Sequence, residues 1–277
     1  NYEITFVSGT FTIDPRPIEV TATNQARAYG DPDPLPFAYT VTSGTLIGDD
    51  TLTGALERES GEAVGEYPIT PGTLGAGPNY EVTVVGGTLT ILQRPITVTA
   101  DDQSRTYGDS DPGLTWTVTA GALVGDDSLS GELEREPGED VGEYDILQGS
   151  LANDSYLITF EPGTLEITRK PITVTADDQS KQFGESDPEL TATADGLLPG
   201  DSLSGSLTRE SGEDVGDYAI LAGTISAGGN YTITSVQPAT FTVTARQITV
   251  AAQDQSATYG DTLPANGVTL VEGSLAP

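Results

Sequence analysis

Three residue types are missing from the sequence altogether: cysteine, histidine and methionine. Without cysteine the chain has no disulfides and no thiolate metal sites. Without cysteine and histidine it also lacks the thiolate and imidazole groups that serve most nucleophilic and acid–base catalysis. We therefore predict that the protein is not an enzyme.

Basic residues are scarce, with 11 lysines and arginines against 42 aspartates and glutamates, so the formal net charge is −31. A field of this sign repels nucleic acid and anionic membranes. No stretch approaches the roughly 18 apolar residues of a membrane span, and no signal peptide is visible at Asn1. We predict no nucleic-acid partner and no direct membrane insertion in this segment.

What the sequence does contain is a tandem repeat. Residues 94–104 return as residues 170–180, and looser copies begin at Arg16 and Arg246. The markers Pro17, Pro95, Pro171 and Gln247 are spaced by 78, 76 and 76 residues. A fixed period of this length indicates a tandem array of small domains.

The period predicts five segments. They are the C-terminal part of a preceding repeat at 1–15, repeat 1 at 16–93, repeat 2 at 94–168, repeat 3 at 169–245, and the N-terminal part of a further repeat at 246–277. We favour the interpretation that the chain is an excerpt of a longer one. The alternative is that residues 1–13 of one molecule complete the open repeat at 247–277 of the next, giving a head-to-tail filament by strand exchange.

Within each repeat the residues alternate between apolar and polar, as at 18–23, and turn clusters recur every 8–12 residues or so. About seven short strands per repeat predict an all-β array of small Ig-like β-sandwiches. Residues 80–92 and 1–13 read as hairpins. The one helical candidate, at 196–201, leaves open β-grasp-like units with one short helical turn.

The joints between repeats contain no Gly/Ser linker. Only Gln93 and Arg94 separate one strand from the next at the first joint, and Pro95 stiffens the start of the new strand. We expect near-continuous strands to pass from one repeat into the next, which predicts an elongated rod.

Several motifs recur in order in every repeat: Arg-Pro-Ile-Thr-Val-Thr-Ala, Tyr-Gly-Asp-x-Asp-Pro, Gly-Asp-Asp/Ser-x-Leu-Ser-Gly, Val-Gly-Glu-Tyr after a Gly-Glu-Asp turn, and Asn-Tyr. In repeat 2 they occupy residues 94–100, 107–112, 125–131, 135–144 and Tyr156. Together they resemble the MBG repeat domain of the Tyr-Gly-x type, over the whole chain. Phe183-Gly184-Glu185 and Asp154-Ser155-Tyr156 are the departures.

The resemblance implies a long surface-exposed or secreted bacterial protein, often adhesin-like, in which the repeats form stalks. It implies no catalytic residues. We therefore expect a structural repeat region, a stalk or filament-forming segment, that is extracellular or at the cell surface. Its expected partners are neighbouring repeats, and the alternative is a module that binds a host or matrix glycan or protein.

Acidic turns are the first candidate chemistry of the sequence. Weak calcium candidates are Asp31, Asp33, Asp49, Asp50, Asp126 and Asp127. Aspartate also favours turns for its own backbone hydrogen bonds, so no cofactor is assigned. A glycosidase would need its carboxylate pair once, whereas each acidic pair here recurs in every unit.

Aromatic and lysine positions have structural interpretations. Tyr67, Tyr144 and Tyr218 each follow Val-Gly-acid and fit tyrosine corners, in which the hydroxyl bonds nearby backbone. The single tryptophan, Trp116, is expected to pack in the core or on a strand face. A Lys–Asn isopeptide bond cannot be the general stabiliser, because only repeat 3 contains lysine within its fold.

Overall fold

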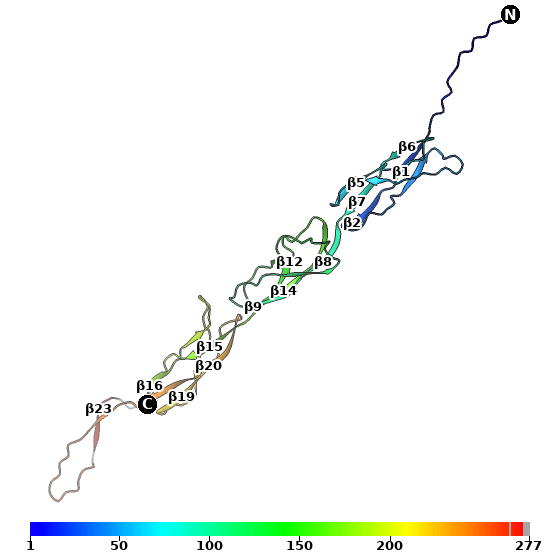
Figure 1. The fold of residues 1–277 in the computed structure, drawn as a ribbon. Coiled ribbons are helices and arrows are strands. Elements are labelled where there is room, and N and C mark those ends of the chain that lie inside the picture. The colour runs from blue at the N-terminus through cyan, green and yellow to red at the C-terminus, as the bar shows by residue number, and fades with distance from the viewer. Residues whose placement is uncertain (266, 274–277) are drawn as a thin grey trace. The chain divides into compact units, whose positions relative to one another are not determined.

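The computed structural model describes residues 1–265 and 267–273. Its contacts divide the chain into two units, one of residues 1–102, 114–136 and 145–164, the other of residues 103–113, 137–144 and 165–277. Every regular element among the described residues is a β-strand (Figure 1). In the same part of the chain no helix is long and apolar enough to cross a membrane.

Repeat 1 consists of seven strands in two sheets. They are β1 (Arg16–Ala22), β2 (Gln25–Ala28), β3 (Tyr39–Ser43), β4 (Glu57–Arg58), β5 (Gly65–Thr70), β6 (Tyr80–Val85) and β7 (Thr88–Leu92). One sheet has the order β3-β1-β6 and the other the order β2-β7-β5-β4. This confirms the predicted small Ig-like sandwich of about seven strands.

Two long strands of repeat 1 each change sheets part-way. β1 runs parallel to β6 in the first sheet, and its continuation β2 runs parallel to β7 in the second. The crossover requires close approach: a Cβ on Gly87 would lie 2.7 Å from the carbonyl oxygen of Ala22. The hairpin predicted for residues 80–92 is therefore wrong, because β6 and β7 pair with β1 and β2 rather than with each other.

The same pairing rule explains residues 1–13, which the sequence predicts as a hairpin. They form no strand, and Tyr2, Phe6 and Phe11 are almost fully exposed. Their counterparts in repeat 1 are β6 and β7, which need the parallel partners β1 and β2 of the same repeat. Alternation alone therefore does not make this segment a hairpin.

Repeat 2 follows the same strand order. Its strands are β8 (Arg94–Ala100), β9 (Gln103–Thr106), β10 (Trp116–Ala120), β11 (Glu134–Arg135), β12 (Gly142–Leu147), β13 (Tyr156–Glu161) and β14 (Gly163–Thr168). The sheet β10-β8-β13 again places the first strand between an antiparallel and a parallel neighbour. β9 pairs in parallel with β14.

Repeat 3 repeats the pattern once more. Its strands are β15 (Lys170–Ala176), β16 (Gln179–Gln182), β17 (Ala192–Asp195), β18 (Thr208–Arg209), β19 (Gly216–Leu221), β20 (Tyr231–Gln237) and β21 (Ala239–Thr244). The sheets are β17-β15-β20 and β16-β21-β19-β18. Beyond them β22 (Thr249–Ala252) pairs antiparallel with β23 (Val268–Glu272).

The helical turn allowed at 196–201 does not form. The chain makes a hydrogen-bonded turn there, in which the Asp201 amide donates to the Leu198 carbonyl oxygen at 3.1 Å. Pro199 has no amide hydrogen to extend a helix, and Gly200 adopts a positive φ of 101°. The sandwich interpretation therefore holds over the β-grasp alternative with its helical turn.

Repeats 1 and 3 each have an apolar core that joins residues of both their sheets. In β1 the side chains of Ile18, Val20 and Ala22 are buried, and the intervening Glu19 is exposed, as alternation predicts. They pack with residues of the second sheet such as Leu89. In repeat 2, Trp116 packs against the cluster formed by Ile96, Val98, Leu151 and Tyr156, which confirms its predicted packing role.

The three predicted tyrosine corners are confirmed. The hydroxyls of Tyr67, Tyr144 and Tyr218 each donate to the carbonyl oxygen four residues upstream, at 2.8 Å. A glycine lies under each ring: a Cβ on Gly61 would be 2.2 Å from Cε1 of Tyr67. The corner thus fixes the loop that precedes β5, β12 or β19.

A core substitution in repeat 2 tests this packing. Leu151 is 2% exposed, so Leu151→Ala should reduce the free energy of unfolding by about 2–5 kcal/mol, through lost burial and a residual cavity. Leu157→Ala, on the exposed side of β13, should change it by no more than about 0.5 kcal/mol. Urea unfolding followed by Trp116 fluorescence measures both, and equal effects would contradict the assignment of the core.

Candidate functional site

The candidate functional site is the joint between successive repeats. Gln93 alone separates β7 from β8, and Arg169 alone separates β14 from β15. This confirms the predicted near-continuous passage of strands. A connection of one residue leaves little freedom, and it places the end of β2 or β9 beside the next repeat.

At the first joint Tyr29 inserts into repeat 2. Its amide donates to the Leu92 carbonyl oxygen at 2.9 Å, which places the residue at the end of the β2–β7 ladder. Its ring meets that of Tyr156 edge to face, with centroids 5.7 Å apart, and joins the apolar cluster around Ile96 and Val98. Such aromatic pairs are worth about 0.5–1.5 kcal/mol beyond the area that they bury.

The two residues after Tyr29 complete the contact. Gly30 has a φ of +79°, and a Cβ there would lie 2.4 Å from Cγ2 of Val124. Glycine is therefore required both for the turn and for the approach of repeat 2. The carboxylate of Asp31 accepts a hydrogen bond from Nη1 of Arg94 at 2.8 Å, and the same nitrogen donates to the Tyr29 carbonyl oxygen at 2.9 Å.

Asp127 joins the two tyrosines on the polar side of the joint. Its Oδ2 accepts from the Tyr156 hydroxyl at 2.7 Å. Burial and this hydrogen bond raise the pKa of Tyr156, and the hydrogen bond to Asp127 raises the pKa of Tyr29. Both phenols therefore stay protonated donors to one carboxylate.

The second joint has the same arrangement. Tyr107 and Tyr231 meet edge to face with centroids 5.4 Å apart, and both hydroxyls donate to Asp201. A Cβ on Gly108 would lie 2.4 Å from Cδ1 of Leu198. The Tyr-Gly-acid motif is thus a docking turn, and the next repeat receives it with a tyrosine, an aspartate and an aliphatic side chain.

Repeat 1 carries the receiving residues as Tyr80, Asp50 and Ile47. The Tyr80 hydroxyl donates to Asp50 at 2.7 Å, as its counterparts do. Tyr80 is only half-buried and Ile47 is 55% exposed, whereas Tyr156 is 3% exposed. The difference shows how much of the receiving surface a docked turn covers.

An ion-pair cluster within the same repeat stabilises the docking turn. In repeat 1, Nε of Arg27 and Nε of Arg58 each lie 2.7 Å from Asp33, one on either carboxylate oxygen, and both guanidinium groups also pair with Glu62. The arginine side chains are less than a tenth exposed. Because Arg27 and Asp33 flank the turn at residues 29–31, the cluster fixes its position.

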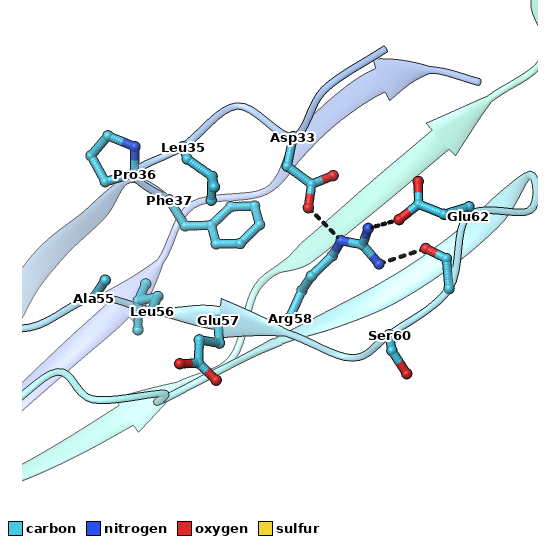
Figure 2. A pocket seen from close by; sticks show the side chains of 11 residues that line it. Asp33, Leu35, Pro36, Phe37, Ala55, Leu56, Glu57, Arg58, Ser60 and Glu62 are labelled. Atoms are coloured by element: carbon cyan, nitrogen blue, oxygen red, sulfur yellow. Dashed lines mark hydrogen bonds and ion pairs between the residues drawn. The ribbon is translucent and has the colours of Figure 1, made fainter. Parts of the chain in front are cut away.

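Figure 2 shows three members of this cluster, Asp33, Arg58 and Glu62, at one wall of an open hollow of about 700 Å³. The opposite wall is apolar, with Leu35, Pro36, Phe37 and Leu56. Hydrogen bonds from the Arg58 guanidinium lower the pKa of Asp33 and of Glu62, so both remain ionised. Nη1 of Arg58 also donates to the carbonyl oxygens of Glu59 and Gly61, at 2.8 and 2.6 Å.

The other repeats keep the cluster with one change of cation. Arg105 pairs with Asp111 at 2.6 Å and with Glu139 at 2.5 Å in repeat 2. In repeat 3 the same place is taken by Lys181, which pairs with Asp187 and Glu213 alongside Arg209. Arg209, through its hydrogen bond, lowers the pKa of Asp187 to about 2. Because an isopeptide bond needs a protonated acid and a neutral amine, this environment favours the ion pair.

In the structure the six calcium candidates have different surroundings. Asp31 and Asp33 are paired with arginines, and Asp50 and Asp127 accept tyrosine hydroxyls. Asp49 and Asp126 lie in exposed turns. Among the described residues no three acidic side chains gather closely enough to hold a metal ion. Calcium binding by these turns stays a prediction.

Sequence reasoning missed both the docking role of Tyr-Gly-acid and the ion-pair clusters. A signal for each was present. Tyr-Gly-acid recurs at a fixed distance from a downstream tyrosine, and each repeat places scarce cations at fixed positions among many carboxylates. Neither signal says by itself that the partners of the tyrosine lie in the next repeat.

Gly30→Ala tests the docking turn. It should destabilise repeat 2 more than Gly125→Ala, because Gly125 also has a positive φ but has open space around it. We expect about 1 kcal/mol for Gly125→Ala from backbone strain and about 1–3 kcal/mol more for Gly30→Ala from the clash with Val124. Urea unfolding followed by Trp116 fluorescence measures both, and adding Val124→Ala should remove the excess. No rescue would contradict the contact.

The ion-pair cluster of repeat 3 predicts a pH dependence. Because the folded-state pKa of Asp187 is lowered to about 2, its contribution is present above the ordinary aspartate pKa and is lost as pH falls toward 2. Calorimetric unfolding between pH 7 and pH 2 should show this loss in the wild type. Asp187→Asn should cost stability at pH 7 and flatten the profile below pH 4, whereas Asp195→Asn on β17 should keep it. An unchanged slope in Asp187→Asn would refute the assignment.

Comparison with known proteins agrees with the repeated geometry. The family model described as the MBG domain (YGX type) matches three times, at residues 18–90, 96–166 and 172–242. Curated proteins yield no match. A crystal structure of the N-terminal eight Ig domains of Down Syndrome Cell Adhesion Molecule isoform 1.30.30 aligns with 86% of the chain, at 12% identity. The chain spans 44% of that structure, and the TM-score of 0.24 is too low to carry an argument. The three family matches cover most of the sequence, and the chain therefore belongs to the MBG domain (YGX type) family.

Proposed function

We propose that this chain is a structural repeat region, a stalk or spacer, of a large extracellular bacterial surface or adhesin-like protein. The observation that carries the proposal is the docking turn. At both joints an aromatic side chain of one repeat is packed into the core of the next, Tyr29 against Tyr156 and Tyr107 against Tyr231.

A spacer has to resist bending at its joints, and these joints are built for that. Flexible linkers let neighbouring domains move independently. Here one residue connects the strands, the turn is packed from both sides, and an ion pair between Asp31 and Arg94 closes the first joint. Bending at such a joint would expose apolar surface and break hydrogen bonds, so stiffness follows from the contacts.

The charge distribution supports a position outside the cell. Six of the eleven basic residues form the ion pairs described above, namely Arg27, Arg58, Arg94, Arg105, Lys181 and Arg209. The acidic excess is therefore left to the surface. A strongly acidic surface stays solvated and discourages association between neighbouring stalks.

A second candidate function is binding of a glycan or protein by the hollow in repeat 1. The observation that favours it is the apolar wall beside the ion-pair cluster, where Leu35 is 67% exposed. Exposed apolar side chains next to fixed polar groups are typical of binding sites.

Small-angle scattering of chains that differ in repeat number tests the spacer. β1 and its continuation β2 run through repeat 1 from Arg16 to Ala28, so at about 3.3 Å per residue each repeat should add about 40 Å to the maximum dimension. Deleting repeat 3 should shorten the particle by that amount and leaves the joint between repeats 1 and 2 unchanged. A maximum dimension that does not depend on repeat number would refute the spacer, and a glycan or matrix-protein array signal that Leu35→Asp abolishes would favour the second candidate.

A further inference from the structure

The two joints share their aromatic centre but differ at one pair of polar residues beside it. At the second joint Nδ2 of Asn230 donates to Oδ1 of Asp140 at 2.8 Å. The Asn230 Oδ1 accepts from the amide of Val141 at 3.0 Å. The side-chain amide of Asn230 thus both donates and accepts a hydrogen bond across the joint.

Asn230 and Asp140 are both positioned by tyrosines of their own repeats. Asn230 immediately precedes Tyr231, the buried tyrosine that receives the docking turn. Asp140 lies in the loop fixed by the tyrosine corner, because its carbonyl oxygen accepts from the Tyr144 hydroxyl. The amide therefore meets a carboxylate and a backbone N–H whose positions are set before the repeats dock.

The first joint cannot make this contact. The residues at the corresponding positions are Ala63 in the loop and Ser155 before Tyr156. That joint uses other polar contacts: Arg94 pairs with Asp31, and Nε2 of Gln93 donates to the Asp154 carbonyl oxygen at 3.1 Å. Aspartate thus occurs together with asparagine at one joint, and alanine together with serine at the other.

We propose that Asp140 and Asn230 form a pairing latch that determines which MBG repeats fit next to one another. A loop with aspartate fits a following repeat with asparagine before its buried tyrosine, and a loop with alanine fits one with serine. A mismatch leaves either a carboxylate or an amide without its partner at the joint. The latch rests on the proposed function only in that repeats dock in series.

The pairing rule also applies to two further positions that carry asparagine or aspartate, one in repeat 1 and one in repeat 3. Asn79 precedes Tyr80 and fits a preceding repeat that presents aspartate in its loop. Asp214 occupies the loop position of repeat 3 and fits a following repeat that presents asparagine. Next to it Val215 is 59% exposed, whereas Val141 at the latched joint is half-buried.

Hydrogen exchange at the Val141 amide, read by NMR on the full 277-residue chain, tests the latch directly. Asn230→Ser removes the acceptor of that amide and should speed its exchange about five- to tenfold, the loss of one hydrogen bond. Asp140→Ala should speed it less, because the carboxylate only orients Asn230. The Val64 amide at the first joint is the internal control and should not change.

Transplanting the pair to the first joint tests the pairing rule. Ala63→Asp together with Ser155→Asn should slow exchange of the Val64 amide about five- to tenfold. Either substitution alone should not. Equal protection in a single variant, no protection in the double variant, or unchanged Val141 exchange in Asn230→Ser would each overturn the proposal. Scattering against repeat number tests the spacer separately, so one can fail without the other.

Discussion

The insertion of an aromatic side chain from one repeat into the core of the next is the interaction on which this chain depends. Tyr29 and Tyr107 each pack against an apolar cluster that belongs to the following repeat. A unit of about 76 residues buries only a modest core, so a borrowed aromatic side chain matters to its stability. Stability and connection between repeats are therefore one property rather than two.

Ion pairs also stabilise the joint, because they fix the docking turn within its own repeat. In a chain with 42 acidic and 11 basic residues, each buried cation is surrounded by carboxylates, as Arg27 is by Asp33 and Glu62. Breaking such a pair would leave an uncompensated charge of low exposure, which is costly. The clusters flank the docking turns, so the scarce positive charge fixes the position of the tyrosine that docks.

Much of the fold could be predicted from local pattern. Alternation located the strands, as at Ile18 and Val20, and the Val-Gly-acid-Tyr motif predicted the tyrosine corner at Tyr67. The hairpin predicted at residues 80–92 failed because antiparallel return is only one way to use two adjacent strands. Here each pairs in parallel with a strand more than 60 residues earlier, and local pattern does not carry that information.

The sequence by itself determined the tandem array, the all-β class, the short joints and the lack of cysteine and histidine, because period, alternation and composition are local properties of the chain. The tertiary structure alone decided what Tyr-Gly-acid does, which carboxylates pair with cations, and that Asp140 meets Asn230 ninety positions away. Those contacts arise when one folded repeat meets the next. They depend on the register of parallel strands and on the approach that Gly30 and Gly108 permit.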